Sequence, residues 1–201
     1  MKTIYYTINI WRTIIAYLLI RTCSNREMIV EEIFYWGKCA GKNNQSYFRL
    51  LSCLLLEMKE YRNLLFMRIR SNRGGGIRSA IFRLLFPLKD TLALCCTNIG
   101  KNLYIQHGFA TQISAQSIGE NCWINQQVTI GYSFDDKPPI IGNGVRISAG
   151  AKVIGNINIG NNAIIGANAV VTKNVADNDI VVGVPAKPIK KNVDHCLWIS
   201  D

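Results

Sequence analysis

The sequence predicts a mainly β protein, a parallel β-helix preceded by an α-helical region. From residue 99 onward an aliphatic residue returns at every sixth position, whereas before residue 98 the apolar residues follow the helical period. The 201 residues are 49% hydrophobic and 18% charged, which suffices for a core and excludes a disordered polypeptide. We therefore expect a basic helical region at 1–97, a β-helix at 98–189 and a C-terminal tail at 190–201.

The helical region is predicted from its apolar spacing. Leucines, a methionine and a tyrosine between residues 51 and 65 fall on one face of a long helix, which we expect over 46–70. Two further helices are expected over 28–36 and 77–86, and Pro87 ends the second of these. An apolar run near the N-terminus is bracketed by arginines and is too short to span a bilayer.

The six-residue repeat is most regular between residues 141 and 175. Isoleucine or valine stands at six successive positions, usually followed by glycine or another small residue: Ile141, Ile147, Val153, Ile159, Ile165 and Val171. An earlier run has the same spacing, and the stretch between Ile105 and Ile118 is irregular. Three hexads complete one turn of a triangular prism with the aliphatic side chains inside. Ordinary strands of a sandwich would instead alternate with a period of two.

The composition restricts the classes of function. Seven cysteines without a CxxC pair indicate free thiols in a reducing cytosol, and two histidines cannot supply three imidazole ligands to a zinc ion. Of the net charge of +10, residues 1–100 carry +9, with eight Lys or Arg and only Glu60 between Lys59 and Lys89. Three interpretations of this basic stretch stay open. It is a solvated helix face, or it contacts an anionic membrane surface or glycan. The third is a contact with nucleic acid, for which no motif is visible.

The stretch Ile99–Lys187 resembles the hexapeptide-repeat acyltransferases, and within them the serine acetyltransferase-like group, which includes members associated with surface polysaccharides. The resemblance rests on five features in order: His107, QQVTIG at 126–131, a short loop at 132–139, SAGAKVIGNI at 148–157 and GVPAK at 183–187. It implies a left-handed β-helix, an exception to the usual crossover rule, and a homotrimer. From the free cysteines we expect a cytoplasmic protein, peripheral to the inner face of the membrane if the basic half contacts lipid.

The resemblance assigns catalysis to His107, because the resembling enzymes keep their catalytic histidine in this coil and the repeat holds no other. Imidazole titrates near neutral pH, so it can accept the proton of a hydroxyl that attacks a thioester carbonyl, and the leaving thiolate can recover that proton. The scheme requires neither a metal nor an acyl-enzyme. Without such a context a lone histidine is more often structural, and His195, outside the repeat, is predicted to be non-catalytic.

Two departures from serine acetyltransferases concern the acceptor. Those enzymes carry Asp before the catalytic histidine, where this chain has Gln106, and an amide stabilises an imidazolium only weakly. Their longer loop holds a second serine-binding histidine, which corresponds to Lys137 here. We expect both residues to contact the acceptor, which is either serine or, as the departures favour, a hydroxyl of a surface-polysaccharide sugar. The alternative is a non-catalytic β-helical scaffold that binds an anionic glycan or a membrane.

The resemblance also implies acetyl-CoA as co-substrate. The family lays the pantetheine arm between adjacent prisms against small residues, which correspond here to Ala149, Gly150, Gly166 and Ala167. Contacts to the nucleotide phosphates are expected from Thr172, Lys173 and Lys187, with Lys190 and Lys191 as weaker candidates. The other interpretation stays open: the small residues only fit the corners of the prism and the lysines are solvated.

Overall fold

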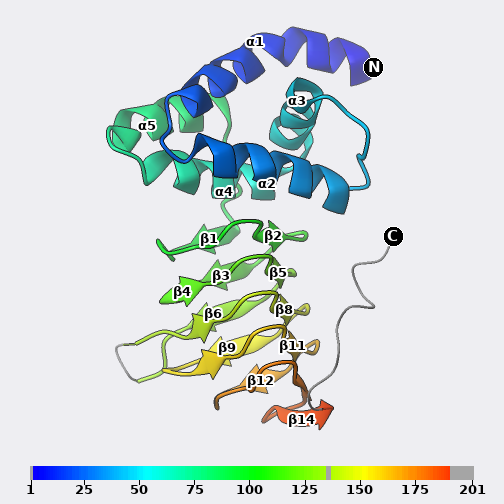
Figure 1. Ribbon diagram of the computed structural model, residues 1–201, viewed down its shortest axis with the longest axis vertical. Coiled ribbons are helices and arrows are strands. Elements are labelled where there is room, and N and C mark those ends of the chain that lie inside the picture. The colour runs from blue at the N-terminus through cyan, green and yellow to red at the C-terminus, as the bar shows by residue number, and fades with distance from the viewer. Residues whose placement is uncertain (1, 135–136, 191–201) are drawn as a thin grey trace. The chain divides into compact units, whose positions relative to one another are not determined.

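The structure, a computed structural model, describes residues 2–134 and 137–190. The chain divides into two compact units between Asp90 and Thr91, and each unit is described by itself. The described part of the first unit contains five helices and that of the second a stack of short strands (Figure 1). The predicted parallel β-helix after an α-helical region is thereby confirmed. The units divide earlier than the change of period at residue 98, because strand β1 (Leu92–Leu94) already pairs with the next coil.

The helices of the first unit are α1 (Lys2–Arg21), α2 (Arg26–Cys39), α3 (Tyr47–Glu57), α4 (Lys59–Arg70) and α5 (Gly75–Leu85). Their core consists of fully buried apolar side chains, among them Ile29, Ile33, Trp36, Leu51, Leu54, Leu55, Tyr61, Leu64 and Phe82. The rings of Trp36 and Tyr61 meet edge to face with centroids 5.2 Å apart, an arrangement that aromatic pairs prefer. No helix in the described part of the chain is both long and apolar enough to cross a membrane.

The prediction of one helix over 46–70 is wrong, because the chain is extended at Met58 between α3 and α4. Arg62 stabilises this break from the first turns of α4. Its Nε donates to the carbonyl of Leu55 over 2.6 Å and its Nη2 to that of Leu56 over 3.1 Å. The guanidinium thus replaces intrahelical partners that the end of α3 lacks. Apolar spacing continues through the break, so the period could not reveal it.

A buried ion pair joins α2 to α4. Arg68 Nη2 lies 2.6 Å from Glu32 Oε1, and Arg68 Nε donates to Glu32 Oε2 over 3.2 Å. Glu32 is 1% exposed. Lys89 pairs with Glu60. Arg78 donates to the carbonyl of Thr22 over 2.6 Å. Together with Arg62, four of the eight cations between residues 59 and 89 therefore make hydrogen bonds or ion pairs inside the unit, and the interpretation as a solvated face does not hold for them.

The strands of the second unit form three sheets. After β1 they are β2 (Tyr104–Ile105), β3 (Thr111–Ile113), β4 (Ser117–Ile118), β5 (Trp123–Ile124), β6 (Thr129–Gly131), β7 (Ile140–Ile141), β8 (Arg146–Ile147), β9 (Lys152–Ile154), β10 (Asn158–Ile159), β11 (Ile164–Ile165), β12 (Val170–Val171), β13 (Ile180–Val182) and β14 (Lys187–Lys190). Sheet A has the order β1-β3-β6-β9-β12, sheet B the order β10-β7-β4 and sheet C the order β14-β13-β11-β8-β5-β2. All pairings are parallel except β13 with β14.

The register follows from the hexads. Ile140 pairs with Asn158, 18 residues later, which is one turn of three hexads. Ser117 and Ile140 pair at a separation of 23 residues, because the loop at 132–139 adds five to that turn. The aliphatic residues that begin the six regular hexads are all buried, at most 2% exposed. The interior of the prism is therefore the core that the period predicted.

Three corners join the sheets, and we name them by the sheets that they connect. In the B–C corner the backbone is left-handed at Asn102, Asn121, Gly144, Asn162 and Asn178. Asparagine adopts this conformation more readily than other side chains. The stacked amides also hydrogen-bond between coils, Asn102 Nδ2 to Asn121 Oδ1 over 2.9 Å and Asn162 Nδ2 to Asn178 Oδ1 over 3.1 Å. The corner residues thus fix both the turn and the stacking.

Candidate active site

The C–A corner brings together several residues singled out from the sequence. It begins where strands of sheet C end, so Gln106 and His107 follow β2 and Ala149 and Gly150 follow β8. Gly166 and Ala167 follow β11 in the same way. Backbone hydrogen bonds stack these coils, with Gly150 N donating to Gln126 O and Asn168 N to Ala149 O. The predicted catalytic residue and the predicted contacts for the pantetheine arm therefore lie along one edge of the prism.

The first of these corners is longer than those that follow. Ile105 pairs with Ile124 across sheet C, and Gln112 pairs with Thr129 across sheet A. Six residues lie between Ile105 and Gln112, but only four lie between Ile124 and Thr129. The corner at 106–111 therefore contains a two-residue insertion in an otherwise regular repeat.

His107 lies on this insertion. Its φ is +65°, in the left-handed region that costs a non-glycine residue on the order of 1 kcal/mol. Gly108 follows with φ +33°. The His107 side chain is exposed. Such strain persists only where the surrounding structure imposes it, and it gathers at functional sites. The sequence identified the histidine, but it showed this stretch only as irregular.

Gln106 is held by an aromatic residue that the sequence analysis did not single out. Trp123 Nε1 donates to Gln106 Oε1 over 3.2 Å and to Asn125 Oδ1 over 2.8 Å. An indole N–H is only a donor, so it fixes the amide oxygen of Gln106 toward Trp123 and leaves the amide nitrogen as the donor of that side chain. The Trp123 ring also packs on Tyr104 at 4.5 Å and faces the Arg146 guanidinium at 5.7 Å.

The separation of Tyr104 and Trp123 could have revealed this cluster. Their 19-residue spacing is the register of β2 with β5, which places them side by side on the outer face of sheet C. Each of the two residues precedes the inward-facing isoleucine of its coil, so the six-residue pattern of buried aliphatic residues does not include them.

The glycines of the C–A corner are explained by the packing of the coils. A Cβ on Gly150 would lie 2.0 Å from Asn168 Oδ1, and one on Gly166 would lie 2.6 Å from Val182 Cγ1. A side chain at either position would therefore displace Asn168 or Val182, so the packing of the coils favours glycine at both without reference to a ligand. Ala149 is half-buried and Ala167 exposed on the same edge, and neither side chain extends beyond Cβ. A ligand could approach the backbone closely at these two residues.

The remaining predicted site residues lie elsewhere on the prism. Lys137 belongs to the loop that leaves β6 at the A–B corner, and Thr172 and Lys173 follow β12 at that corner. Lys187 begins β14, at the end of sheet C. All four are exposed. Within one chain they are therefore separated from His107 by the width of a sheet or by several strands. Lys190 is exposed at the end of β14, whereas Lys191 and His195 lie outside the described residues.

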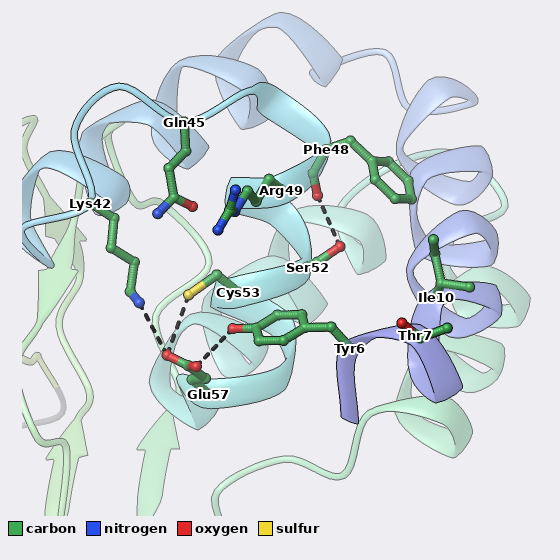
Figure 2. A pocket seen from close by; sticks show the side chains of 10 residues that line it. All are labelled: Tyr6, Thr7, Ile10, Lys42, Gln45, Phe48, Arg49, Ser52, Cys53 and Glu57. Carbon is green, nitrogen blue, oxygen red and sulfur yellow. Dashed lines mark hydrogen bonds and ion pairs between the residues drawn. The ribbon is translucent and has the colours of Figure 1, made fainter. Parts of the chain in front are cut away.

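The helical unit contains a cavity of about 520 Å³ between α1, α3 and the segment that joins α2 to α3 (Figure 2). Glu57 is its central polar group. Tyr6 Oη donates to Glu57 Oε1 over 2.7 Å, Lys42 Nζ lies 3.1 Å from Oε2, and Cys53 Sγ donates to Oε2 over 3.4 Å. Burial acts to raise the pKa of Glu57, but the hydrogen bonds from these three groups outweigh it and lower the pKa to about 2. The network joins α1 to α3.

Glu57→Gln is expected to lower the free energy of unfolding by about 1 kcal/mol at pH 7, a value reduced for solvent screening. The folded pKa of about 2 lies below the ordinary value of 4.5, so the ionised carboxylate stabilises the fold above pH 4.5. This contribution is lost as the pH falls toward 2, and the stabilities of the two proteins should converge there. Denaturant titrations from pH 2.5 to 7 measure it, with Glu120→Gln as an exposed control. A difference independent of pH would contradict the assignment.

Comparison with known proteins agrees with this architecture. The family described as "Bacterial transferase hexapeptide (six repeats)" matches residues 138–173. This match covers the part of the three-sheet prism from β7 to β12, where the hexads are most regular.

The similarity extends to serine acetyltransferases. That of Staphylococcus aureus (strain Mu50) is 44% identical over 98 residues, which are 47% of this chain and 46% of the relative. The chain thus spans about half the length of the curated relatives that it matches. Soybean serine acetyltransferase, as apoenzyme, superposes with a TM-score of 0.63 at 27% identity over 83% of this chain and 69% of that one. A serine acetyltransferase in complex with CoA gives 0.57, at 26% identity over 87% and 83%. The resemblance to hexapeptide-repeat acyltransferases of the serine acetyltransferase-like group is confirmed.

Proposed function

We propose that this protein is an O-acetyltransferase that moves the acetyl group of acetyl-CoA to a hydroxyl. The observation that carries the proposal is the position of His107, exposed on a strained two-residue insertion in a solenoid similar to those of serine acetyltransferases. As the base, His107 takes the hydroxyl proton while that oxygen forms a bond to the thioester carbonyl carbon. The tetrahedral intermediate then breaks its C–S bond, and the thiolate of CoA recovers the proton from the imidazolium.

Acetyl-CoA fits the residues of the C–A corner. Ala149 and Ala167 leave the backbone open to a pantetheine arm, and exposed Lys173 and Lys187 are available to phosphates. One of the similar serine acetyltransferase structures is a complex with CoA, which supports the same co-substrate.

A homotrimer accounts for the distribution of these residues. The cations and His107 lie on different parts of one prism, so we infer that a neighbouring copy completes a groove between prisms. Light scattering of an active preparation should return about three times the 22.6 kDa of one chain. A monomer mass would contradict the trimer.

For the acceptor we favour a sugar hydroxyl over serine, although the similar proteins are named for serine. Gln106 replaces the carboxylate that would stabilise the imidazolium, and its amide oxygen is already engaged by Trp123. The loop that contains Lys137 lies at the A–B corner, so in the proposed trimer it would border the groove from the neighbouring copy, and its short length favours a larger glycan there. We place the reaction in the cytoplasm, on surface-polysaccharide intermediates, with no nucleic-acid partner.

Gln106→Asp is expected to raise kcat/KM for serine by roughly tenfold. One carboxylate oxygen can accept the Trp123 N–H while the other stabilises the imidazolium, which a single amide oxygen does poorly. Thiol release from acetyl-CoA measures the effect. Gln106→Asn is the matched control, since it has the size of Asp without the charge. If the Asp and Asn variants show equal rates with serine, this role of the residue is excluded.

A further inference from the structure

Helix α1 has an apolar face that no described part of the chain covers. Its members are 53–65% exposed and follow a spacing of four, three and seven residues, which places them on one stripe: Ile4, Ile8, Trp11 and Leu18. The other face of α1 packs into the helical unit through Thr13, Ala16 and Ile20, which are buried. A helix that is apolar on both faces usually has both covered. We call the exposed residues the α1 stripe.

The charges around the α1 stripe indicate what covers it. Helix α1 contains Lys2, Arg12 and Arg21 and no acidic residue. Residues 1–90 contain 15 basic and 6 acidic side chains, a net charge of +9. If two copies of the chain met through this stripe, the cations of their α1 helices would lie close together. The net positive charges of the two helical units would then repel each other. An anionic surface would instead be attracted to the same charges.

Two basic side chains of α1, those of Arg12 and Arg21, lie at the flanks of the stripe. The Arg12 guanidinium lies 4.7 Å from the Phe86 ring centroid and donates to Asn9, so it is held beside the helix. Arg21, at the end of α1, is exposed and lies over the Tyr17 ring at 5.9 Å. This combination of an apolar stripe with flanking cations is typical of helices that lie in a membrane interface.

The residue types and length agree with that position. Trp11 belongs to the α1 stripe and Tyr5 is exposed next to it, and both residue types are enriched at the level of lipid headgroups. From Ile4 to Leu18 the stripe extends for about 21 Å at 1.5 Å per residue. We propose that the α1 stripe binds the surface of an anionic lipid bilayer, with α1 lying along the interface. This inference does not depend on the proposed acetyl transfer.

Sedimentation of the full chain with large unilamellar vesicles tests the proposal. We expect binding to vesicles of 30% phosphatidylglycerol in phosphatidylcholine, weakened by high salt, and little binding to phosphatidylcholine alone. The double variant Ile8→Glu with Trp11→Glu should bind at least tenfold more weakly, since both sites are exposed and the charges would enter the apolar layer. Phe134→Glu, which removes a fully exposed aromatic residue from the second unit, should bind as the wild type does.

Two further measurements keep the test decisive. Brominated lipid should quench the fluorescence of the wild type more than that of Trp11→Phe, which preserves an apolar residue and avoids any effect of added charge on folding. Light scattering of the double variant tests whether a second copy of the chain covers the stripe instead of lipid. The proposal is overturned if the wild type does not bind vesicles, or if Phe134→Glu loses as much vesicle binding as the double variant. It is also overturned if the double variant changes its oligomer mass in the absence of lipid.

Discussion

The His107→Asn variant is expected to lose roughly 10²–10⁴-fold in kcat, the range for removal of a general base. Asparagine accepts the left-handed backbone that His107 adopts at φ +65°, so the corner should keep its conformation while the base is removed. The KM for acetyl-CoA should change little, because the predicted contacts of the co-substrate lie in other coils. Initial rates of thiol release measure both constants.

The second histidine of the chain provides the matched control for this experiment. His195→Asn should leave kcat within about twofold of the wild type, since this residue lies outside the repeat. Circular dichroism and thermal unfolding verify that both variants are folded. A His107→Asn protein with the turnover of the wild type would remove the catalytic assignment, and an equal loss in both variants would show that the effect is not specific.

The largest loss of stability is expected for Glu32→Ala. The variant leaves the Arg68 guanidinium, whose side chain is 9% exposed, without the carboxylate that lies 2.6 Å away. Removal of one partner from a buried ion pair costs about 3–5 kcal/mol, because the remaining charge stays desolvated. Urea unfolding measures the change. Fluorescence of Trp36 reports on the helical unit, and comparison with a variant that lacks Trp36 separates its signal from those of the other tryptophans.

Two controls separate the ion pair from general effects of substitution. Glu27→Ala removes an exposed carboxylate from the first turn of the same helix and should cost about 0.5 kcal/mol. Glu32→Leu combined with Arg68→Met replaces both charges by apolar groups and should recover most of the lost stability. If Glu32→Ala costs no more than Glu27→Ala, the ion pair does not stabilise the unit.

The fold of the second unit was predictable because one physical requirement repeats in it. Every third hexad returns to the same face, so the residue that must be buried returns with the same period, as Ile141 and Ile159 show. The helical unit offers no such repetition. The break at Met58 depends on a guanidinium that reaches back to two carbonyls, and Glu32 finds Arg68 at a distance of 36 residues. Such pairings depend on tertiary packing, which the apolar period does not encode.

The candidate site was predictable only in part for a related reason. His107 was found because it matches a coil of known enzymes, whereas its two-residue insertion becomes evident only when the pairings on both sides are known. Trp123 and Tyr104 each precede the inward-facing isoleucine of their coil, so the six-residue pattern of aliphatic residues does not include them. Gly150 and Gly166 were interpreted equally as cofactor contacts or as corner residues, and the contacts that a Cβ would make with Asn168 and Val182 show that packing favours glycine at both.

Release of free thiol from acetyl-CoA by the full chain, with serine and a panel of hexoses, amino sugars and their lipid-linked forms as acceptors, tests the proposed function most directly. We predict acceptor-dependent release, highest for a sugar and abolished in His107→Asn, with one acetyl ester formed for each thiol. A kcat/KM for serine far above that of every sugar would contradict the proposed acceptor. Absence of acceptor-dependent release throughout the panel, from folded protein, would contradict the acetyltransferase itself.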